Sequence, residues 1–293
     1  MNDLADLYRR KLNIPHAVFT HIDHEDAMVA AVFKILQLGR RDLILKVCSR
    51  KEDFLRESYF LNLFAGKLPV PKLIQLIEPE KALDAAVLME CVQGNLLQPG
   101  TITEDLAKEI GSLLARIHLE PAEGYGDLTD STSLSDDPRL PFTMKFEEGL
   151  EECQGHLPNS LLEICRKHFD KDIHLLTSTD GPCVIHRDFR PGNLIASNGK
   201  IEGIIDWSSG RGGFAEEDFC SLEFGGWPAS CKAAFIEGYA SIRKVPNYIQ
   251  IMPLLRLNKA VAAVGFTIKR GTWESKNSKL YQSNLYYLQS LFV

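Results

Sequence analysis

The sequence has no apolar run that approaches the length needed to cross a membrane. Its first ten residues place acidic before basic side chains and lack the apolar core of a signal peptide, so we expect neither export nor a membrane partner. An excess of positive charge is also missing, because 33 lysines and arginines stand against 39 aspartates and glutamates, a formal net charge of −6. Proteins that bind nucleic-acid phosphates are normally basic, so we expect no nucleic-acid partner.

Paired cysteine motifs are missing as well. The chain has seven cysteines, but no two of them form the Cys-x-x-Cys spacing that is typical of zinc and redox sites. We interpret them as buried thiols. Without an export signal, they predict a protein of the reducing cytoplasm.

What is present is an ordinary globular composition, with 293 residues and 45% hydrophobic side chains to fill a core. The first third predicts strands separated by polar turns, after a short amphipathic helix. Ser49 and Glu52 have capping-box spacing and predict a helix that Gly66 would end. The expected strands are residues 16–22, 28–36, 42–48, 72–78 and 85–91.

The rest of the chain is predicted to be mostly helical after a linker at residues 92–100. Apolar residues at helical spacing predict a helix over residues 106–117, and Thr101 with Glu104 predicts its capping box. Further helices are expected at residues 141–154, 159–176, 214–243, 248–270 and 273–292. The strand-rich first third and the helical remainder together indicate an α+β fold.

A short β island over residues 184–206 interrupts these helices, with Asn198-Gly199 as its hairpin turn. Just before the hairpin stands His186–Asn193, which reads His-Arg-Asp-Phe-Arg-Pro-Gly-Asn, and Asp206 follows thirteen residues after Asn193. Phosphoryl transfer needs a carboxylate to orient and deprotonate a hydroxyl, and oxygen ligands to hold magnesium. Asp188 could be that base, with Asn193 and Asp206 as the Mg²⁺ ligands at the two ends of the hairpin.

These residues resemble the catalytic loop and metal-binding aspartate of the protein-kinase-like superfamily. The closer resemblance is to the aminoglycoside phosphotransferase and choline kinase group, because Ile-Ile-Asp-Trp stands in place of Asp-Phe-Gly. Residues 107–118, which end in Ile-His, and residues 213–218, which end in Asp218, resemble two further elements of that group. In this family His186 and Asp218 brace the catalytic loop, so we interpret both as structural.

The resemblance implies a two-lobed fold, with a small antiparallel-sheet N-lobe that carries one main helix and a larger, mostly helical C-lobe. Residues 1–91 would form the nucleotide-binding lobe, and residues 92–293 the catalytic and acceptor-binding lobe. The implied activity is a small-molecule O-kinase that transfers the γ-phosphate of ATP to a hydroxyl. Aminoglycosides, aminosugars and choline are candidate acceptors.

Lys46 lies in an apolar strand, where an inward charge needs an anionic partner, although an exposed strand face is the alternative. The resemblance implies that Lys46 contacts the ATP phosphates and pairs with a helix glutamate, either Glu57 or, less favoured, Glu52. It also implies that Glu90 and Val92 bind adenine through backbone groups, and Arg190 is a candidate to neutralise developing charge.

Other readings stay open. The His-Arg-Asp wording also suits a protein kinase, although Asp-Phe-Gly and Ala-Pro-Glu are missing. Residues 21–29 contain acidic side chains but no glycine, where kinases place a glycine-rich phosphate loop. This motivates a third interpretation, a non-catalytic nucleotide-binding scaffold.

Two groups of glutamates could attract a cationic acceptor, although a solvated helix face is the preferred interpretation of the first group. They are Glu147, Glu148, Glu151 and Glu152, and then Glu216, Glu217 and Glu223.

Overall fold

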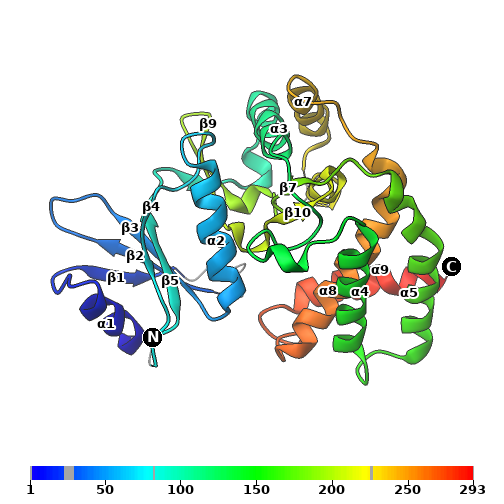
Figure 1. Cartoon of the computed structure of the whole chain (residues 1–293), viewed down its shortest axis with the longest axis horizontal. Coiled ribbons are helices and arrows are strands. Elements are labelled where there is room, and N and C mark those ends of the chain that lie inside the picture. The colour runs from blue at the N-terminus through cyan, green and yellow to red at the C-terminus, as the bar shows by residue number, and fades with distance from the viewer. Residues whose placement is uncertain (1, 23–29, 82, 225–226, 293) are drawn as a thin grey trace. The chain divides into compact units, whose positions relative to one another are not determined.

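The computed structural model describes residues 2–22, 30–81, 83–224 and 227–292 (Figure 1). The chain forms two compact units, each assembled from three segments. Unit 1 is Met1–Ile117, His186–Arg211 and Gly225–Lys244, and unit 2 is His118–Ile185, Gly212–Phe224 and Val245–Val293. Unit 1 therefore brings the catalytic-loop segment together with the N-terminal strands, while the boundary at residue 91 stays a prediction.

Unit 1 contains a five-stranded antiparallel sheet with the strand order β1-β2-β3-β5-β4. The strands are β1 (Val18–His21), β2 (Ala30–Leu36), β3 (Leu43–Cys48), β4 (Leu73–Ile77) and β5 (Ala85–Glu90). All five predicted strands are confirmed within a few residues. Residues 23–29, which include most of the glycine-free loop and the start of the second expected strand, lie outside the described residues.

Two helices cover opposite faces of this sheet, α1 (Asn2–Lys11) and α2 (Lys51–Phe64) (Figure 1). Side chains alternate between the faces of a strand, so Leu45 and Val47 join the core beneath α1, where Tyr8 is fully buried. Lys46, between them, points to the opposite face, which α2 covers. The alternation thus directs one lysine into the space between the sheet and α2.

The two predicted capping boxes are wrong, although the helices are confirmed. The residue that caps α2 is Arg50, in extended conformation with no side-chain cap bond, so Ser49 lies one residue too early. The next helix is α3 (Glu104–His118), and the Thr103 hydroxyl accepts from the Leu106 amide at 3.2 Å. Thr101 lies two residues before this cap, at the end of the 3₁₀ turn Pro99–Thr101, where its hydroxyl donates to the Gln98 carbonyl at 2.9 Å.

The predicted linker carries a short strand, β6 (Asn95–Leu96), which extends the predicted hairpin into a three-stranded sheet. The hairpin strands are β8 (Leu194–Ser197) and β9 (Lys200–Ile204). Asn198 and Gly199 both have positive φ angles, 51° and 73°, as the predicted two-residue turn requires. This hairpin separates Asn193 from Asp206.

Unit 2 is mainly helical. Its helices are α4 (Arg139–Cys153), α5 (Asn159–Asp172), α6 (Cys220–Phe224), α8 (Tyr248–Lys269) and α9 (Ser278–Gln289). A separate two-stranded sheet pairs β7 (Cys183–Ile185) with β10 (Arg211–Gly213). The expected helix over residues 214–243 is wrong as one element. It is divided into a 3₁₀ turn at Ala215–Phe219, then α6 and then α7 (Ala229–Ala240), because Pro228 with ψ 142° cannot continue a helix.

The expectation that no segment reaches membrane-spanning length is corrected by α8. This helix has 22 residues and is apolar enough to cross a membrane by length and composition. However, 61% of the most apolar 18-residue stretch of α8 is buried, and the helix packs against α4 and α9. Within unit 2, α8 serves as the central core helix.

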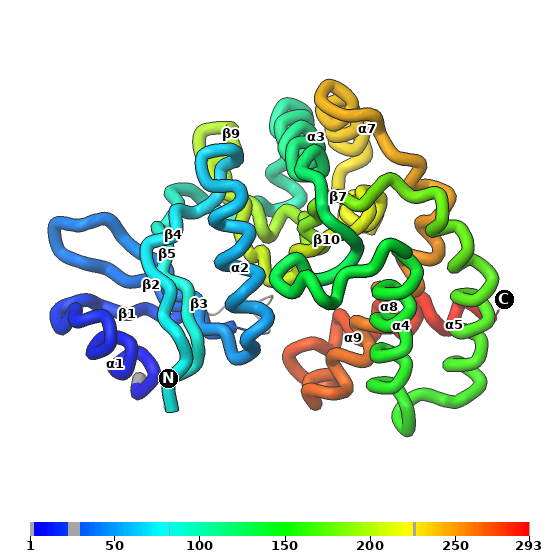
Figure 2. Tube along the Cα trace, viewed as in Figure 1, coloured from blue at the N-terminus to red at the C-terminus, as the bar shows by residue number. Residues whose placement is uncertain are grey.

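In unit 1, α3 and α7 cross at glycines, and the two helices are drawn side by side in Figures 1 and 2. A Cβ placed on Gly238 would lie 1.9 Å from the Lys108 carbonyl oxygen, and one on Gly111 would lie 2.0 Å from the Phe235 carbonyl oxygen. The two backbones therefore touch, and no other residue type fits at either position without moving a helix.

We expect Gly238→Ala to lower the free energy of unfolding by about 1–3 kcal/mol, because the added methyl must push α7 away from α3. Urea unfolding measures the change. Gly100→Ala is the matched control, since a Cβ there meets nothing within 4 Å and should change stability little. Equal stability of the two variants would contradict the close crossing.

Candidate active site

Lys46 forms the central ion pair of unit 1. Its Nζ donates to Glu57 Oε2 of α2 at 2.6 Å and to Asp206 Oδ1 at 2.7 Å. The predicted pairing of Lys46 with Glu57 is confirmed as a contact, whereas Glu52 is exposed at the start of α2. The bond to Asp206, 160 residues along the chain, was not anticipated, because the ATP phosphates were the expected partner.

Lys46 and Glu57 are only 8% and 1% exposed, so the charges depend on one another. Burial by itself would lower the pKa of Lys46, but the Glu57 and Asp206 carboxylates outweigh burial and raise it. The positive charge of Lys46 in turn lowers the pKa of Asp206, against the effect of its own burial. Lys46 therefore stays a cation and Asp206 an anion near neutral pH.

The catalytic loop closes around Asp188. Asn193 Nδ2 donates to the Asp188 backbone carbonyl at 2.8 Å and to its Oδ2 at 2.7 Å. Arg190 Nε lies 3.2 Å from both Asp188 carboxylate oxygens. Three predicted site residues are thus in contact, and the Asp188 side chain is oriented while remaining 34% exposed.

His186 is fully buried and links the catalytic loop to the segment that leads into Asp206. Its Nδ1 accepts from the Asp188 amide at 3.3 Å, and its Nε2 lies 3.1 Å from the Ile205 carbonyl oxygen. Because an amide can only donate, Nδ1 must be unprotonated and Nε2 carries the proton. These bonds agree with the structural interpretation of His186.

Asp206 is fixed by its neighbour Trp207. Asp206 has a left-handed backbone, φ 65°, which few residue types adopt easily. Trp207 is fully buried, with ring centroids 5.6 Å from Phe60 and 4.9 Å from Phe64 of α2. The helix that supplies Glu57 therefore also anchors the turn that supplies Asp206.

The residues predicted to bind magnesium keep suitable oxygens available. Both side-chain hydrogen bonds of Asn193 use Nδ2, and those of Asp206 use Oδ1, so in the described part of the chain Asn193 Oδ1 and Asp206 Oδ2 accept none. Amide and carboxylate oxygens suit Mg²⁺, which commonly takes its remaining ligands from phosphates and water. The described residues contain no cluster of three or more His, Cys, Asp or Glu side chains that could hold a metal.

The predicted adenine-binding residues lie at and just after the end of β5, in the five-stranded sheet that also carries Lys46. Glu90 ends β5, and its amide donates to the Lys72 carbonyl at 3.0 Å. Val92 lies two residues further along the chain, and its side chain packs against Gly203 of β9. A Cβ placed on Gly203 would lie only 3.1 Å from Val92 Cγ1. Their adenine-binding role stays a prediction.

The acidic groups are largely occupied by other partners. In α4, three of the four glutamates form ion pairs, which supports a solvated, ion-paired helix face. The pairs are Glu147–Arg166, Glu148–Lys145 and Glu152–Lys269. Glu216 is buried and accepts from the Asp180 amide at 3.1 Å, so it stabilises a turn.

Unit 2 contains a buried pair that the sequence did not indicate. His118 Nε2 lies 3.1 Å from Asp218 Oδ2, and both side chains are fully buried. Asp218 is therefore a structural residue, as predicted, and the histidine that ends α3 is its partner. The two are 100 residues apart, so no local pattern shows the contact.

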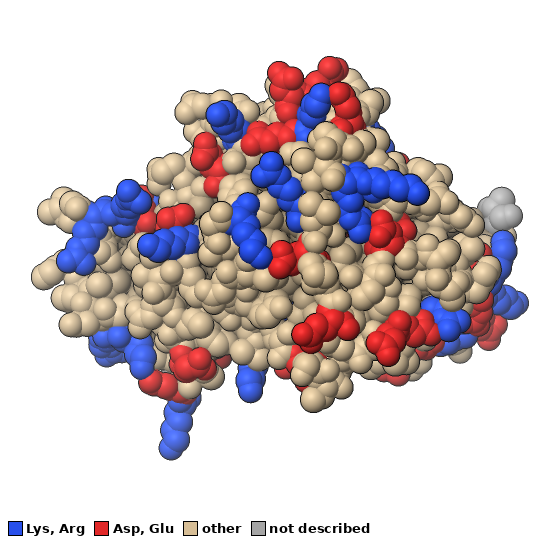
Figure 3. Space-filling view, turned by 45° about the horizontal axis from the view of Figure 1, so that its top comes forward, with Lys and Arg blue, Asp and Glu red and all other residues tan. Residues whose placement is uncertain are grey.

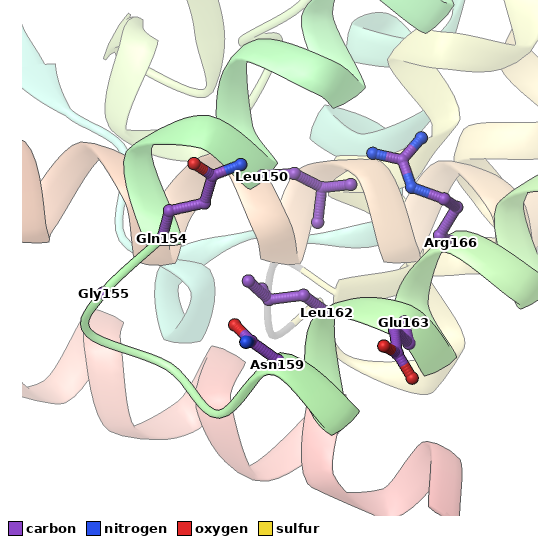
Figure 4. Close-up of a pocket in the computed structure, with 7 residues that line it drawn as sticks. All are labelled: Leu150, Gln154, Gly155, Asn159, Leu162, Glu163 and Arg166. Carbon is purple, nitrogen blue, oxygen red and sulfur yellow. The ribbon is translucent and has the colours of Figure 1, made fainter.

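A separate hollow of about 410 Å³ lies in unit 2 between α4 and α5 (Figure 4). Leu150 and Leu162 point into it, and the Gln154 and Asn159 amides stand near its edge. Arg166 also lines it but is already paired with Glu147. None of the predicted site residues lines this hollow, so we assign it no role in the chemistry.

We expect Lys46→Met to lower the free energy of unfolding by about 3–5 kcal/mol, because Glu57 and Asp206 would then face each other without a cation. Urea unfolding measures the loss. Lys34→Met is the control, since the Lys34–Asp42 pair at 2.9 Å is partly exposed to solvent and should contribute about 1 kcal/mol or less. A loss no larger than that of the control would contradict the central role of Lys46.

Solved structures with a similar fold cover nearly the whole chain. A thermostable mutant of aminoglycoside phosphotransferase APH(4)-Ia, in complex with AMP-PNP and hygromycin B, is 15% identical with a TM-score of 0.73, over 98% of both chains. ADP-bound APH(2'')-Ib is 15% identical with a TM-score of 0.65, over 99% of this chain and 97% of that one. The gentamicin complex of APH(2'')-IIa is 14% identical with a TM-score of 0.70, over 98% and 95%. The predicted kinase-like fold is confirmed.

Family membership rests on the sequence itself. No curated protein matches the chain. A family model described as the phosphotransferase enzyme family matches residues 29–251, which include every predicted site residue. The chain therefore belongs to the phosphotransferase enzyme family.

Proposed function

We propose that this phosphotransferase is a magnesium-dependent O-kinase that transfers the γ-phosphate of ATP to a hydroxyl group of a small molecule. One observation carries the proposal: Lys46 joins the sheet, α2 and the turn after β9 through its bonds to Glu57 and Asp206. In kinases the phosphate-binding lysine pairs with a helix glutamate, and an aspartate nearby holds the metal; Lys46, Glu57 and Asp206 lie together as those three residues would.

Asp188 would orient the acceptor hydroxyl and take its proton. Its carboxylate is held by Asn193 and remains partly exposed, so an incoming hydroxyl can reach it. Arg190, beside the same carboxylate, would stabilise negative charge on the transferred phosphoryl group.

Nucleotide binding would involve Lys46 at the phosphates and the backbone of Glu90 and Val92 at adenine. Asn193 and Asp206 would hold Mg²⁺ through their available oxygens, and the ion would neutralise the charge of the β- and γ-phosphates. We retain residues 1–91 as the nucleotide-binding lobe and residues 92–293 as the catalytic and acceptor-binding lobe.

The acceptor class is the finer part of the proposal. The structures of similar fold include complexes of other proteins with hygromycin B and with gentamicin, so aminoglycosides are the first acceptors to test. Aminosugars and choline come next. Three of the four α4 glutamates are ion-paired and Glu216 is buried, so these four residues are poorly placed to attract a cationic acceptor.

We place the activity in the cytoplasm. The seven cysteines are free thiols, and six of them are buried. A reducing compartment, in which ATP is abundant, suits both the thiols and the proposed donor.

We expect Asp188→Asn to lower kcat by about 10²- to 10⁴-fold, because the general base is lost while the loop keeps its shape. The measurement is ATP turnover with magnesium, against aminoglycosides, aminosugars, choline, sugars and a generic protein substrate. Asp170→Asn, an exposed position on α5, should leave turnover unchanged.

Turnover with one small hydroxyl compound would support the proposal and name the acceptor class. Phosphorylation of the protein substrate instead would replace it with the protein-kinase reading. ATP binding without any phosphorylated acceptor would favour a non-catalytic nucleotide-binding scaffold.

A further inference from the structure

Arg256 of α8 lies against two aromatic rings in unit 2. Its guanidinium carbon is 4.9 Å from the ring centroid of Phe224 on α6 and 4.7 Å from that of Tyr287 on α9. Its Nη1 donates to Asn284 Oδ1, also on α9, at 2.7 Å. Side chains from three helices therefore determine where this guanidinium lies.

This cation has no counterion in the part of the chain that the structure describes. Asn284 is its hydrogen-bond partner there, and no carboxylate pairs with it. The nearest acid in sequence to Phe224 is Glu223, whose carboxylate is bonded to the Tyr248 hydroxyl. Burial lowers the pKa of Arg256, which means that the charge has lost hydration without gaining an anion.

The guanidinium still has donors to offer. It carries five N–H groups in a planar fork, and the bond to Asn284 uses one nitrogen. None of its nitrogens is among the buried, unpartnered polar atoms of the described residues, so solvent reaches the donors that remain. Such a fork matches the two oxygens of a carboxylate or a phosphate.

The hydrogen-bond acceptor of Arg256 is itself held by a second contact. Asn284 is only 4% exposed, and its Nδ2 donates to the Leu280 carbonyl at 2.8 Å, which fixes the oxygen that receives Arg256. Phe224 is 45% exposed and leaves an apolar ring face at the edge of the site. A ligand would therefore meet a cation already held by Asn284 beside an aromatic surface, which lowers the entropic cost of ordering the arginine on binding.

We propose that Arg256, with Phe224, Tyr287 and Asn284, forms a binding site for the carboxylate or phosphate group of a small molecule. The anion would accept parallel N–H bonds from the guanidinium and supply the missing counterion. This site goes beyond the proposed kinase activity and does not depend on it, because none of its residues belongs to the catalytic cluster.

The test is protection of Arg256 from phenylglyoxal, followed by peptide mass mapping of the full chain. The probes are inorganic phosphate and acetate, each compared with chloride at equal ionic strength. We expect phosphate, acetate or both to slow modification of Arg256 several-fold, and the more protective probe identifies the preferred group. Arg166, paired with Glu147, is the internal control and should not respond.

Equal modification of Arg256 in phosphate, acetate and chloride would overturn the proposal and leave Arg256 as a structural contact between helices. A second measurement uses Phe224→Leu, which removes an exposed ring and keeps the arginine. The protection should weaken in this variant. Unchanged protection would place the bound anion elsewhere and would also overturn the proposal.

Discussion

The buried ammonium of Lys46 is the interaction on which the active cluster depends. It stands between Glu57 and Asp206, and neither carboxylate could approach the other without it. The sheet directs Lys46 toward α2, and Trp207 packs the turn after Asp206 against the same helix. His186 then connects the residue before Asp206 to the Asp188 amide. One cation thus fixes the relation between the N-terminal sheet, its main helix and the catalytic loop.

Much of this could be predicted from the sequence, because its signals are local. The spacing of Asp188, Asn193 and Asp206 belongs to one loop and one hairpin, and the structure places that hairpin as expected. Lys46 and Glu57 are eleven residues apart, on a strand and the next helix, so their pairing can also be predicted from the sequence.

The surface charges follow the composition. Lysines and arginines are mixed with aspartates and glutamates on the face shown in Figure 3, in keeping with the similar numbers of the two kinds in the sequence.

What the sequence does not show depends on tertiary contact or on the exact bend of the chain. The Lys46–Asp206 and His118–Asp218 contacts join residues 160 and 100 positions apart, and the setting of Arg256 needs three helices to meet. Thr103 rather than Thr101 caps α3, because the chain first makes a 3₁₀ turn over Pro99–Thr101 and the helix begins only at Glu104. By length and apolarity alone, α8 cannot be told from a membrane-spanning helix. Only its packing against α4 and α9 shows that it is a core helix.

The most direct test of the central claim is calorimetric titration of ATP into wild type and Asp206→Asn, each with and without magnesium. If the Lys46 cluster binds the phosphates of magnesium-bound ATP, magnesium should tighten binding to the wild type, and the substitution should abolish that gain. Binding that is independent of magnesium in both proteins, or absent from the wild type, would contradict the assignment of this cluster as the site of phosphoryl transfer.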